Sequence, residues 1–325
     1  MTTPRVILCP GQGAQFVGMG KVWHDRSPEA RAVFAEADAV LGSRLGAPLT
    51  KLCFEGPADL LNRTDVSQPA IYACTVAAWR GMLAKWNAGG LEESHVKATA
   101  GLSLGEYTAL HIAGAMSFKD GLELVTLRGR AMQDAAEAVP GGSGMVALIG
   151  ADEAQAKQVC AESVQAGEVL VCANFNAPGQ IVISGSKAAC ERAAATDGPA
   201  AKLGLRATPL PVAGAFHSPL MKPAAERLGA ALTKTAISAP RCTVVSNVTA
   251  LPHEGGASGT IEQAIRTRLV EQLTSPVRWA ESCVWLGKNF AGAEYHEPAP
   301  GKTLAGLMRR IDRNIKVQNH DEPGE

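Results

Sequence analysis

Residues 98–115, ATAGLSLGEYTALHIAGA, join a short apolar run, a glycine-flanked serine and an Ala-rich stretch. The apolar run favours a buried strand and the longer stretch favours a helix, so this segment predicts a strand, a tight turn and a helix. The same order begins at Val6–Cys9, which precedes a Gly-rich turn. Short strand-like runs that alternate with helical stretches indicate an α/β fold with a mainly parallel sheet.

Residues 141–212 have a different rhythm, which predicts a separate small unit. Four strand-like runs enclose two helical stretches, in the order β-α-β-β-α-β of a ferredoxin-like unit. The expected strands are Met145–Ile149, Glu168–Ala173, Gln180–Ser184 and Arg206–Val212, and the expected helices are Asp152–Ala166 and Ser186–Ala195. A glycine-rich loop at Pro140–Gly144 marks the boundary.

The chain of 325 residues is long enough for a large domain with a second unit inserted. We expect residues 1–140 and 213–318 to form one discontinuous domain around the insert. The segment after Asp312 is polar, and residues 319–325 are expected to be frayed.

Composition narrows the possible partners and compartments. Lysine plus arginine equals aspartate plus glutamate, at 31 each, so the chain has no basic field for nucleic acid. Its eight cysteines are scattered without metal-ligand or C-x-x-C spacing, which predicts buried thiols in a reducing compartment. The start of the chain has no basic leader, and no run approaches the ~20 apolar residues that span a bilayer. We therefore expect a soluble cytoplasmic protein, without metal.

The segment Gly101–Gly105 reads G-x-S-x-G, which is the pattern of a nucleophile elbow. Glycines two residues on either side of Ser103 permit a strained strand-to-helix turn that exposes the hydroxyl at a helix N-terminus. The alternative is an ordinary turn in which Ser103 caps the helix, and the pentapeptide alone leaves both open.

Other motifs accompany this serine in a fixed order. They are Gly11–Gln15, Leu127–Met132, Ala213–Met221 (AGAFHSPLM) and Ser275–Trp279. Together with the elbow they resemble the malonyl-CoA:acyl carrier protein transacylase family, from Pro10 to about Arg310. The resemblance implies an α/β-hydrolase-like large domain with an inserted ferredoxin-like small domain.

The resemblance also assigns catalytic roles. Ser103 would be the nucleophile and His217 its general base, and the main-chain N–H groups of Gln12 and Leu104 would form the oxyanion hole. A main-chain carbonyl near Gln272 would orient the histidine, so we expect no triad aspartate.

Arg128 would hold the malonyl carboxylate, because a guanidinium fork matches a carboxylate with two parallel hydrogen bonds. Taken alone it could be an exposed helix charge, and Arg130, two residues further on, would face elsewhere on the helix. His217 taken alone could be a structural histidine, and Gln12 a turn residue.

Further residues are expected at the acyl pocket. Met132 would line it or fill the core, and Phe216 would crowd an α-methyl group and so favour malonyl. Asn174, Asn176 and Asn247 would line the cleft or cap loops. Leu102 departs from the family pattern, in which a histidine usually precedes the serine.

The implied reaction transfers malonyl from the coenzyme A thioester to the phosphopantetheine thiol of acyl carrier protein by a ping-pong cycle. We expect the protein to be a monomer. No bound cofactor is expected, and the phosphopantetheine belongs to the partner. Two alternatives are a serine esterase or thioesterase, which shares G-x-S-x-G, and a non-enzymatic interaction protein on the same scaffold.

Overall fold

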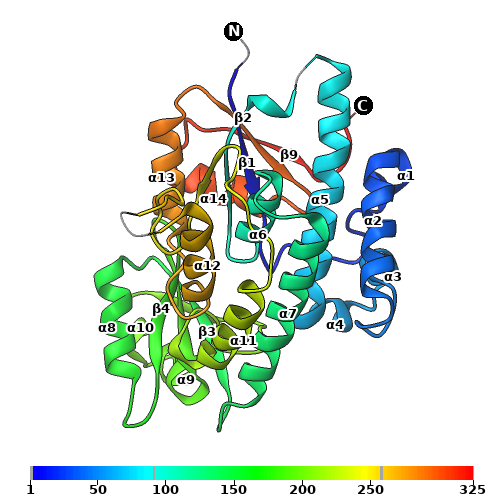
Figure 1. Cartoon of the computed structure of the whole chain (residues 1–325). Helices are drawn as coiled ribbons and strands as arrows, with labels where there is room; N and C mark the ends of the chain where they lie inside the picture. The colour runs from blue at the N-terminus through cyan, green and yellow to red at the C-terminus, as the bar shows by residue number, and fades with distance from the viewer. Residues whose placement is uncertain (1–2, 91, 257–258, 325) are drawn as a thin grey trace.

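A computed structural model describes residues 3–90, 92–256 and 259–324. It contains two sheets that lie in separate units of the chain (Figure 1). The larger is a five-stranded parallel sheet in the order β7-β2-β1-β8-β9, and the smaller is a four-stranded antiparallel sheet in the order β4-β5-β3-β6. The α/β fold class expected from the sequence is therefore confirmed.

The parallel sheet is buried on both faces, as is usual when helices cover each side. Val6 and Leu8 of β1 face one apolar cluster, and Ile7 and Cys9 face another. The first two strands precede the small unit in sequence and the other three follow it. The strands are β1 Arg5–Cys9, β2 Val96–Gly101, β7 Thr243–Val245, β8 Glu294–Pro298 and β9 Val317–His320.

Helices before the small unit cover the face that contains Ile7. The long α5 packs against α2 and α7, and its apolar residues run through the centre of the cluster. These helices are α1 Lys21–Arg26, α2 Pro28–Leu41, α3 Leu49–Glu55, α4 Ala58–Leu61, α5 Thr64–Ala88, η1 Glu93–His95, α6 Gly105–Ile112 and α7 Phe118–Glu137.

Helices after the small unit complete the large domain. Trp279 of α13 and Met308 of α14 pack against Val6 and Leu8 on the opposite face. These helices are η2 Pro219–Met221, α11 Lys222–Leu232, α12 Ile261–Glu271, α13 Trp279–Asn289 and α14 Thr303–Ile311. Within the described residues, no helix is both long and apolar enough to cross a membrane.

The small unit, at the lower left of Figure 1, has the predicted β-α-β-β-α-β order with one additional short helix. Its core forms between one sheet face and the helices, where Leu148 and Ile183 meet Val159. Its elements are β3 Ser143–Ile149, α8 Glu153–Ser163, β4 Leu170–Ala177, β5 Gln180–Ser186, α9 Lys187–Ala194, α10 Pro199–Lys202 and β6 Arg206–Pro209.

One side of the small sheet joins the large domain. The N–H of Phe175 in β4 donates to the carbonyl of Val277 at 2.9 Å, and the Val277 N–H donates to Ala173 at 2.8 Å. The Arg310 guanidinium of α14 also donates to Gln180 Oε1 at 2.6 Å. These bonds fix one wall of the cleft between the two units.

The predicted frayed tail is wrong for residues 319–324, while residue 325 lies outside the described part of the chain. β9 pairs in parallel with β8 from Val317 to His320, and Trp23 Nε1 donates to the His320 carbonyl at 3.0 Å. Asp321 Oδ1 then accepts the Gly301 N–H at 2.7 Å. Main-chain hydrogen bonds hold this edge strand in the sheet, and they do not depend on the side chains. The polar composition of the segment therefore did not predict the pairing.

Candidate active site

The stretch from Gly101 to Gly105 forms the tight turn between β2 and α6. Ser103 has a φ of 53°, a left-handed conformation that costs a non-glycine residue on the order of 1 kcal/mol. A Cβ at Gly101 would lie 1.9 Å from the Gly105 carbonyl carbon, and a Cβ at Gly105 would lie 2.1 Å from the Cys9 oxygen. Only glycine fits at either place, so the reading of this motif as an elbow is supported by its geometry.

Ser103 and His217 meet at the mouth of this turn. Ser103 Oγ lies 2.8 Å from His217 Nε2, and His217 Nδ1 lies 2.7 Å from the main-chain oxygen of Gln272. Since a carbonyl can only accept, Nδ1 carries the proton and Nε2 is left free to accept the serine proton. The predicted trio is brought together, and His217 is only 3% exposed.

The environment of His217 keeps its ring neutral. Burial away from water and then the nearby Arg128 guanidinium lower the pKa of His217 to about 4, although the hydrogen bond to Gln272 acts in the opposite direction. A neutral imidazole can take a proton, so the ring is available as a base across the ordinary pH range.

Arg128 is buried beside the serine and is not an exposed helix charge. Its NH2 group donates to Ser103 Oγ and to Gln272 Oε1, both at 3.0 Å, and its NH1 group donates to Gln68 Oε1 at 2.7 Å. Its Nε has no acceptor among the described residues. Arg130 points elsewhere, as expected, and pairs with Asp65 and Asp134.

The loop after β1 lies against the elbow. A Cβ at Gly11 would come within 2.2 Å of the Leu102 oxygen, so the close approach of the two loops requires glycine there. Within the described chain, the main-chain N–H groups of Gln12 and Leu104 donate to no protein acceptor. They are therefore available for a ligand, and their role in an oxyanion hole stays a prediction.

A cavity of about 560 Å³ opens in front of Ser103 and His217. The large domain contributes the β1 loop, the elbow and Met132 of α7, and the small sheet contributes the opposite wall. Predicted residues that line it are Gln12, Leu102, Met132, Asn174, Asn176 and Phe216.

Asn247 is fully buried behind the elbow, so its predicted place in the cleft is wrong and the capping alternative holds. Its Oδ1 accepts the Ser103 N–H at 2.6 Å and its Nδ2 donates to the Gly101 carbonyl at 2.7 Å. The side chain thus holds the elbow from behind, because β7 ends two residues before it, at Val245, and lies beside β2.

Three buried polar residues near the site were not anticipated from the sequence. Gln68 of α5 holds Arg128, and Glu106 of α6 bonds to His253 and to the Gln272 amide. Glu106 directly follows the elbow, and that adjacency was the one available signal. The described residues contain no group of three or more His, Cys, Asp or Glu side chains that could hold a metal ion.

The sequence and the fold are similar to those of known acyltransferases. Residues 6–292 match the acyl transferase domain family. The malonyl CoA-acyl carrier protein transacylase of Salmonella typhimurium is 43% identical over 99% of this chain and 97% of its own. The solved malonyl-CoA:acyl carrier protein transacylase of Xanthomonas oryzae pv. oryzae is 41% identical, with a TM-score of 0.86 over 99% of this chain and 96% of its own.

A third relative is a malonyl-transacylase solved in complex with its type II PKS acyl-carrier protein. It is 37% identical, with a TM-score of 0.87 over 99% of this chain and 97% of that chain. Sequence and fold agree with these relatives along almost the whole length of the chain. The chain belongs to the malonyl CoA-acyl carrier protein transacylase family of acyltransferases.

Proposed function

We propose that this acyltransferase moves malonyl from malonyl-CoA to the phosphopantetheine thiol of an acyl carrier protein, in support of fatty-acid or polyketide synthesis. The observation that carries the proposal is Arg128 NH2, 3.0 Å from the Ser103 hydroxyl. In malonyl thioesters the free carboxylate is separated from the reacting carbonyl by a single methylene. A cation at this distance from the nucleophile therefore suits a short acyl group with a terminal carboxylate.

In the first half-reaction, Ser103 Oγ attacks the thioester carbonyl as His217 Nε2 takes its proton. The C–S bond breaks, and the imidazolium returns the proton to the departing CoA sulfur. The N–H groups of Gln12 and Leu104 are proposed to stabilise the tetrahedral oxyanion. The product is a malonyl ester on Ser103.

In the second half-reaction, the phosphopantetheine thiol gives its proton to His217 and its sulfur attacks the ester carbonyl. The C–O bond breaks, and His217 returns the proton to Ser103 Oγ. The scheme uses no bound cofactor or metal. The carrier protein is proposed as its partner by analogy with the solved complex of a malonyl-transacylase and its acyl-carrier protein. The monomeric state and cytoplasmic location also remain proposals.

Arg128 discriminates against the esterase or thioesterase alternative. A simple ester substrate offers no carboxylate to pair with a buried guanidinium, and Arg128 Nε is unsatisfied within the described structure. Burying a charge next to the reacting atoms is costly unless a substrate group pairs with it.

Mass spectrometry of the intact protein tests the proposal. Incubation with malonyl-CoA, without carrier protein, should add one malonyl group, and Ser103→Ala should prevent the addition. Acetyl-CoA should load poorly in the same assay. An adduct that maps to a cysteine or to another serine would contradict the assignment.

A further inference from the structure

Glu106 is a fully buried carboxylate one turn behind the nucleophile. It is the second residue of α6, and its exposed fraction is 0%. A buried carboxylate is costly unless its oxygens accept several hydrogen bonds. Within the described chain no lysine or arginine forms an ion pair with it, so its polar neighbours must supply those bonds.

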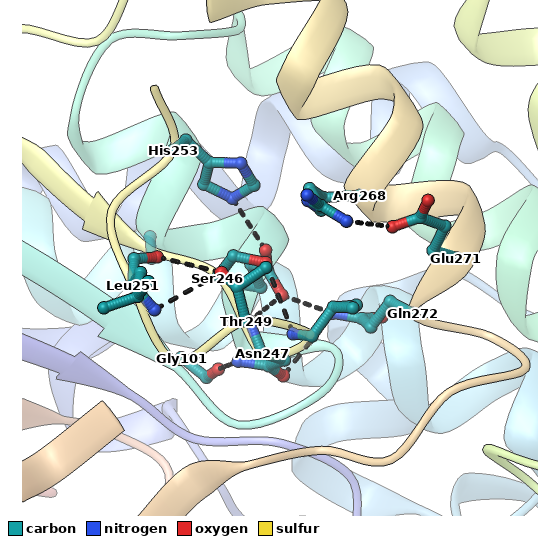
Figure 2. Close-up of polar contacts among 12 residues, drawn as sticks. Gly101, Ser246, Asn247, Thr249, Leu251, His253, Arg268, Glu271 and Gln272 are labelled. Atoms are coloured by element: carbon teal, nitrogen blue, oxygen red, sulfur yellow. Dashed lines mark hydrogen bonds and ion pairs between the residues drawn. The ribbon is translucent and has the colours of Figure 1, made fainter. Parts of the chain in front are cut away.

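Three groups donate toward Glu106 from segments far away in sequence. Oε2 accepts from Gln272 Nε2 at 2.7 Å and from the Asn247 main-chain N–H at 3.1 Å, and Oε1 lies 2.8 Å from His253 Nε2. In Figure 2, His253, Asn247 and Gln272 lie around one group of polar contacts, and dashed lines mark the hydrogen bonds. The carboxylate therefore fastens the loop after β7 and the end of α12 to the elbow.

The bond from Gln272 decides which way its amide faces. A carboxylate only accepts, so Gln272 must turn its NH₂ group toward Glu106, and the same nitrogen donates to the Ser103 carbonyl at 3.0 Å. The amide oxygen then faces Arg128, where it accepts from NH2. The Gln272 side chain thus links a buried anion to a buried cation, and its main-chain oxygen holds His217.

The bond from Asn247 secures the other end of the serine. With its main chain tied to Glu106, Asn247 presents Oδ1 to the Ser103 N–H. Ser103 is consequently held at both its N–H and its carbonyl by residues that Glu106 anchors. These two bonds oppose the relaxation of its left-handed backbone.

We propose that Glu106 is a positioning residue for acyl transfer, whose carboxylate orients Gln272 and Asn247 and through them Ser103, His217 and Arg128. The proposal rests on the proposed function, because it assigns Glu106 to the loading of Ser103. It touches no substrate atom itself. Its removal should lower the rate of the chemical step far more than the affinity for malonyl-CoA.

The decisive variant is Glu106→Leu, which keeps the bulk and removes both acceptors. We expect kcat for loading, per folded molecule, to fall about 100-fold, because misplacement of reacting groups by about 1 Å can cost that much. KM should change less than about threefold. The preference for malonyl over acetyl should also narrow, since Arg128 loses the oriented Gln272 amide.

Glu106→Gln is the rescue variant. Its amide oxygen can still accept from Gln272 and Asn247, so it should recover at least about tenfold over Glu106→Leu. Glu297→Leu is the matched control, because Glu297 is equally buried and its oxygens accept the main-chain N–H groups of Leu304 and Ala305 at 2.8 Å. It should lose stability and keep its kcat per folded molecule within about threefold. Burial raises the pKa of Glu297 to about 7, so assays are run at pH 8.

Folded protein is quantified by circular dichroism. If Glu106→Leu does not fold, Glu106→Asp carries the test, since it keeps the charge and withdraws the oxygens by about 1.5 Å. It should show about tenfold lower kcat with unchanged KM. A wild-type kcat in either folded variant would overturn the proposal, as would equal losses in Glu106→Leu and Glu297→Leu. If malonyl-CoA does not load Ser103 of the wild-type protein, the proposed function itself is overturned.

Discussion

The two walls of the cleft are built in opposite ways. On the large-domain wall, Ser103, His217 and Arg128 are each held by several hydrogen bonds, and His217 and Arg128 are almost wholly buried. On the small-domain wall, Asn174 and Asn176 are half-buried on β4, whose register with β5 shifts beside each of them, and Asn176 Oδ1 has no donor within the described structure. The reacting groups are thus fixed in advance, while the opposite wall keeps polar groups free for a ligand.

Backbone strain is concentrated on the large-domain wall. Both Ser103 and His217 have positive φ, at 53° and 58°, and both lie on the large-domain wall. Such conformations persist only where surrounding bonds over-determine them. We therefore expect changes on the large-domain wall to act on the rate of chemistry, and changes on the small-domain wall to act mainly on binding.

The largest expected effect is that of His217→Ala. In the proposed scheme one imidazole takes and returns the proton in both half-reactions, so loading and transfer should each slow by at least about 10³-fold. Stopped-flow or quenched loading assays with malonyl-CoA measure the first step, and malonyl-protein with added holo carrier protein measures the second. Loading at the normal rate would remove His217 from the mechanism.

Arg128→Ala comes next, because it removes the buried charge that we propose pairs with the malonyl carboxylate. We expect kcat/KM for malonyl-CoA to fall about 10- to 100-fold, since hydrogen bonds to charged groups contribute about 1.5–3 kcal/mol. Acetyl-CoA has no carboxylate, so its slow loading should hold steady or improve. A uniform loss for both substrates would show that Arg128 supports the fold or the CoA moiety instead.

Asn176→Ala probes the opposite wall and should have a smaller effect. A neutral hydrogen bond contributes about 0.5–1.5 kcal/mol, so kcat/KM for malonyl-CoA should fall about 2- to 10-fold, chiefly through KM. Saturation kinetics separate the two constants. A loss confined to kcat would erase the proposed division between the walls.

The pH dependence of Ser103 loading should show the smallest effect. Since the base is the neutral ring and the pKa of His217 is lowered to about 4, loading should stay nearly level from pH 7 to 5 and be halved near pH 4. In Arg128→Ala the acid limb should move upward, because the guanidinium contributes to the lowering. An acid limb near 6.5 in the wild type would contradict this environment.

The lowered pKa of His217 should also make the free energy of unfolding depend on pH. In the unfolded chain a histidine titrates near its ordinary pKa, about 6.5, so between that pH and about 4 the unfolded state binds the proton first. The free energy of unfolding should therefore decrease as pH falls through this window. Thermal melts recorded beside the kinetics separate this loss from the chemistry.

Much of the fold and site could be read from local pattern. The glycines at 101 and 105 predict an elbow, since backbone contacts there exclude any Cβ. The alternation of strands and helices in residues 141–212 predicts the small unit, because each element shows its period within a few residues. The motifs around His217 and Arg128 placed both residues at the site through resemblance to a family.

Other features could not be read in this way. The polar segment Val317–His320 forms a strand because its main chain pairs with β8. The side chains of the segment do not predict this pairing. Gln68 reaches Arg128 across the interface of α5 and α7, and Asn247 reaches the elbow because β7 lies beside β2.

The sequence alone was enough to predict the strand, turn and helix around Ser103 and the order of the other elements. These follow from backbone sterics and short-range periodicity. The sequence also contained the serine, histidine and arginine that acyl transfer from malonyl-CoA requires. Only the tertiary structure decided that Glu106, Asn247, His253 and Gln272 form one hydrogen-bonded group behind the nucleophile. The reason is physical: a buried polar side chain needs partners, and those partners come from residues more than a hundred positions away, which only the packed chain brings within bonding distance.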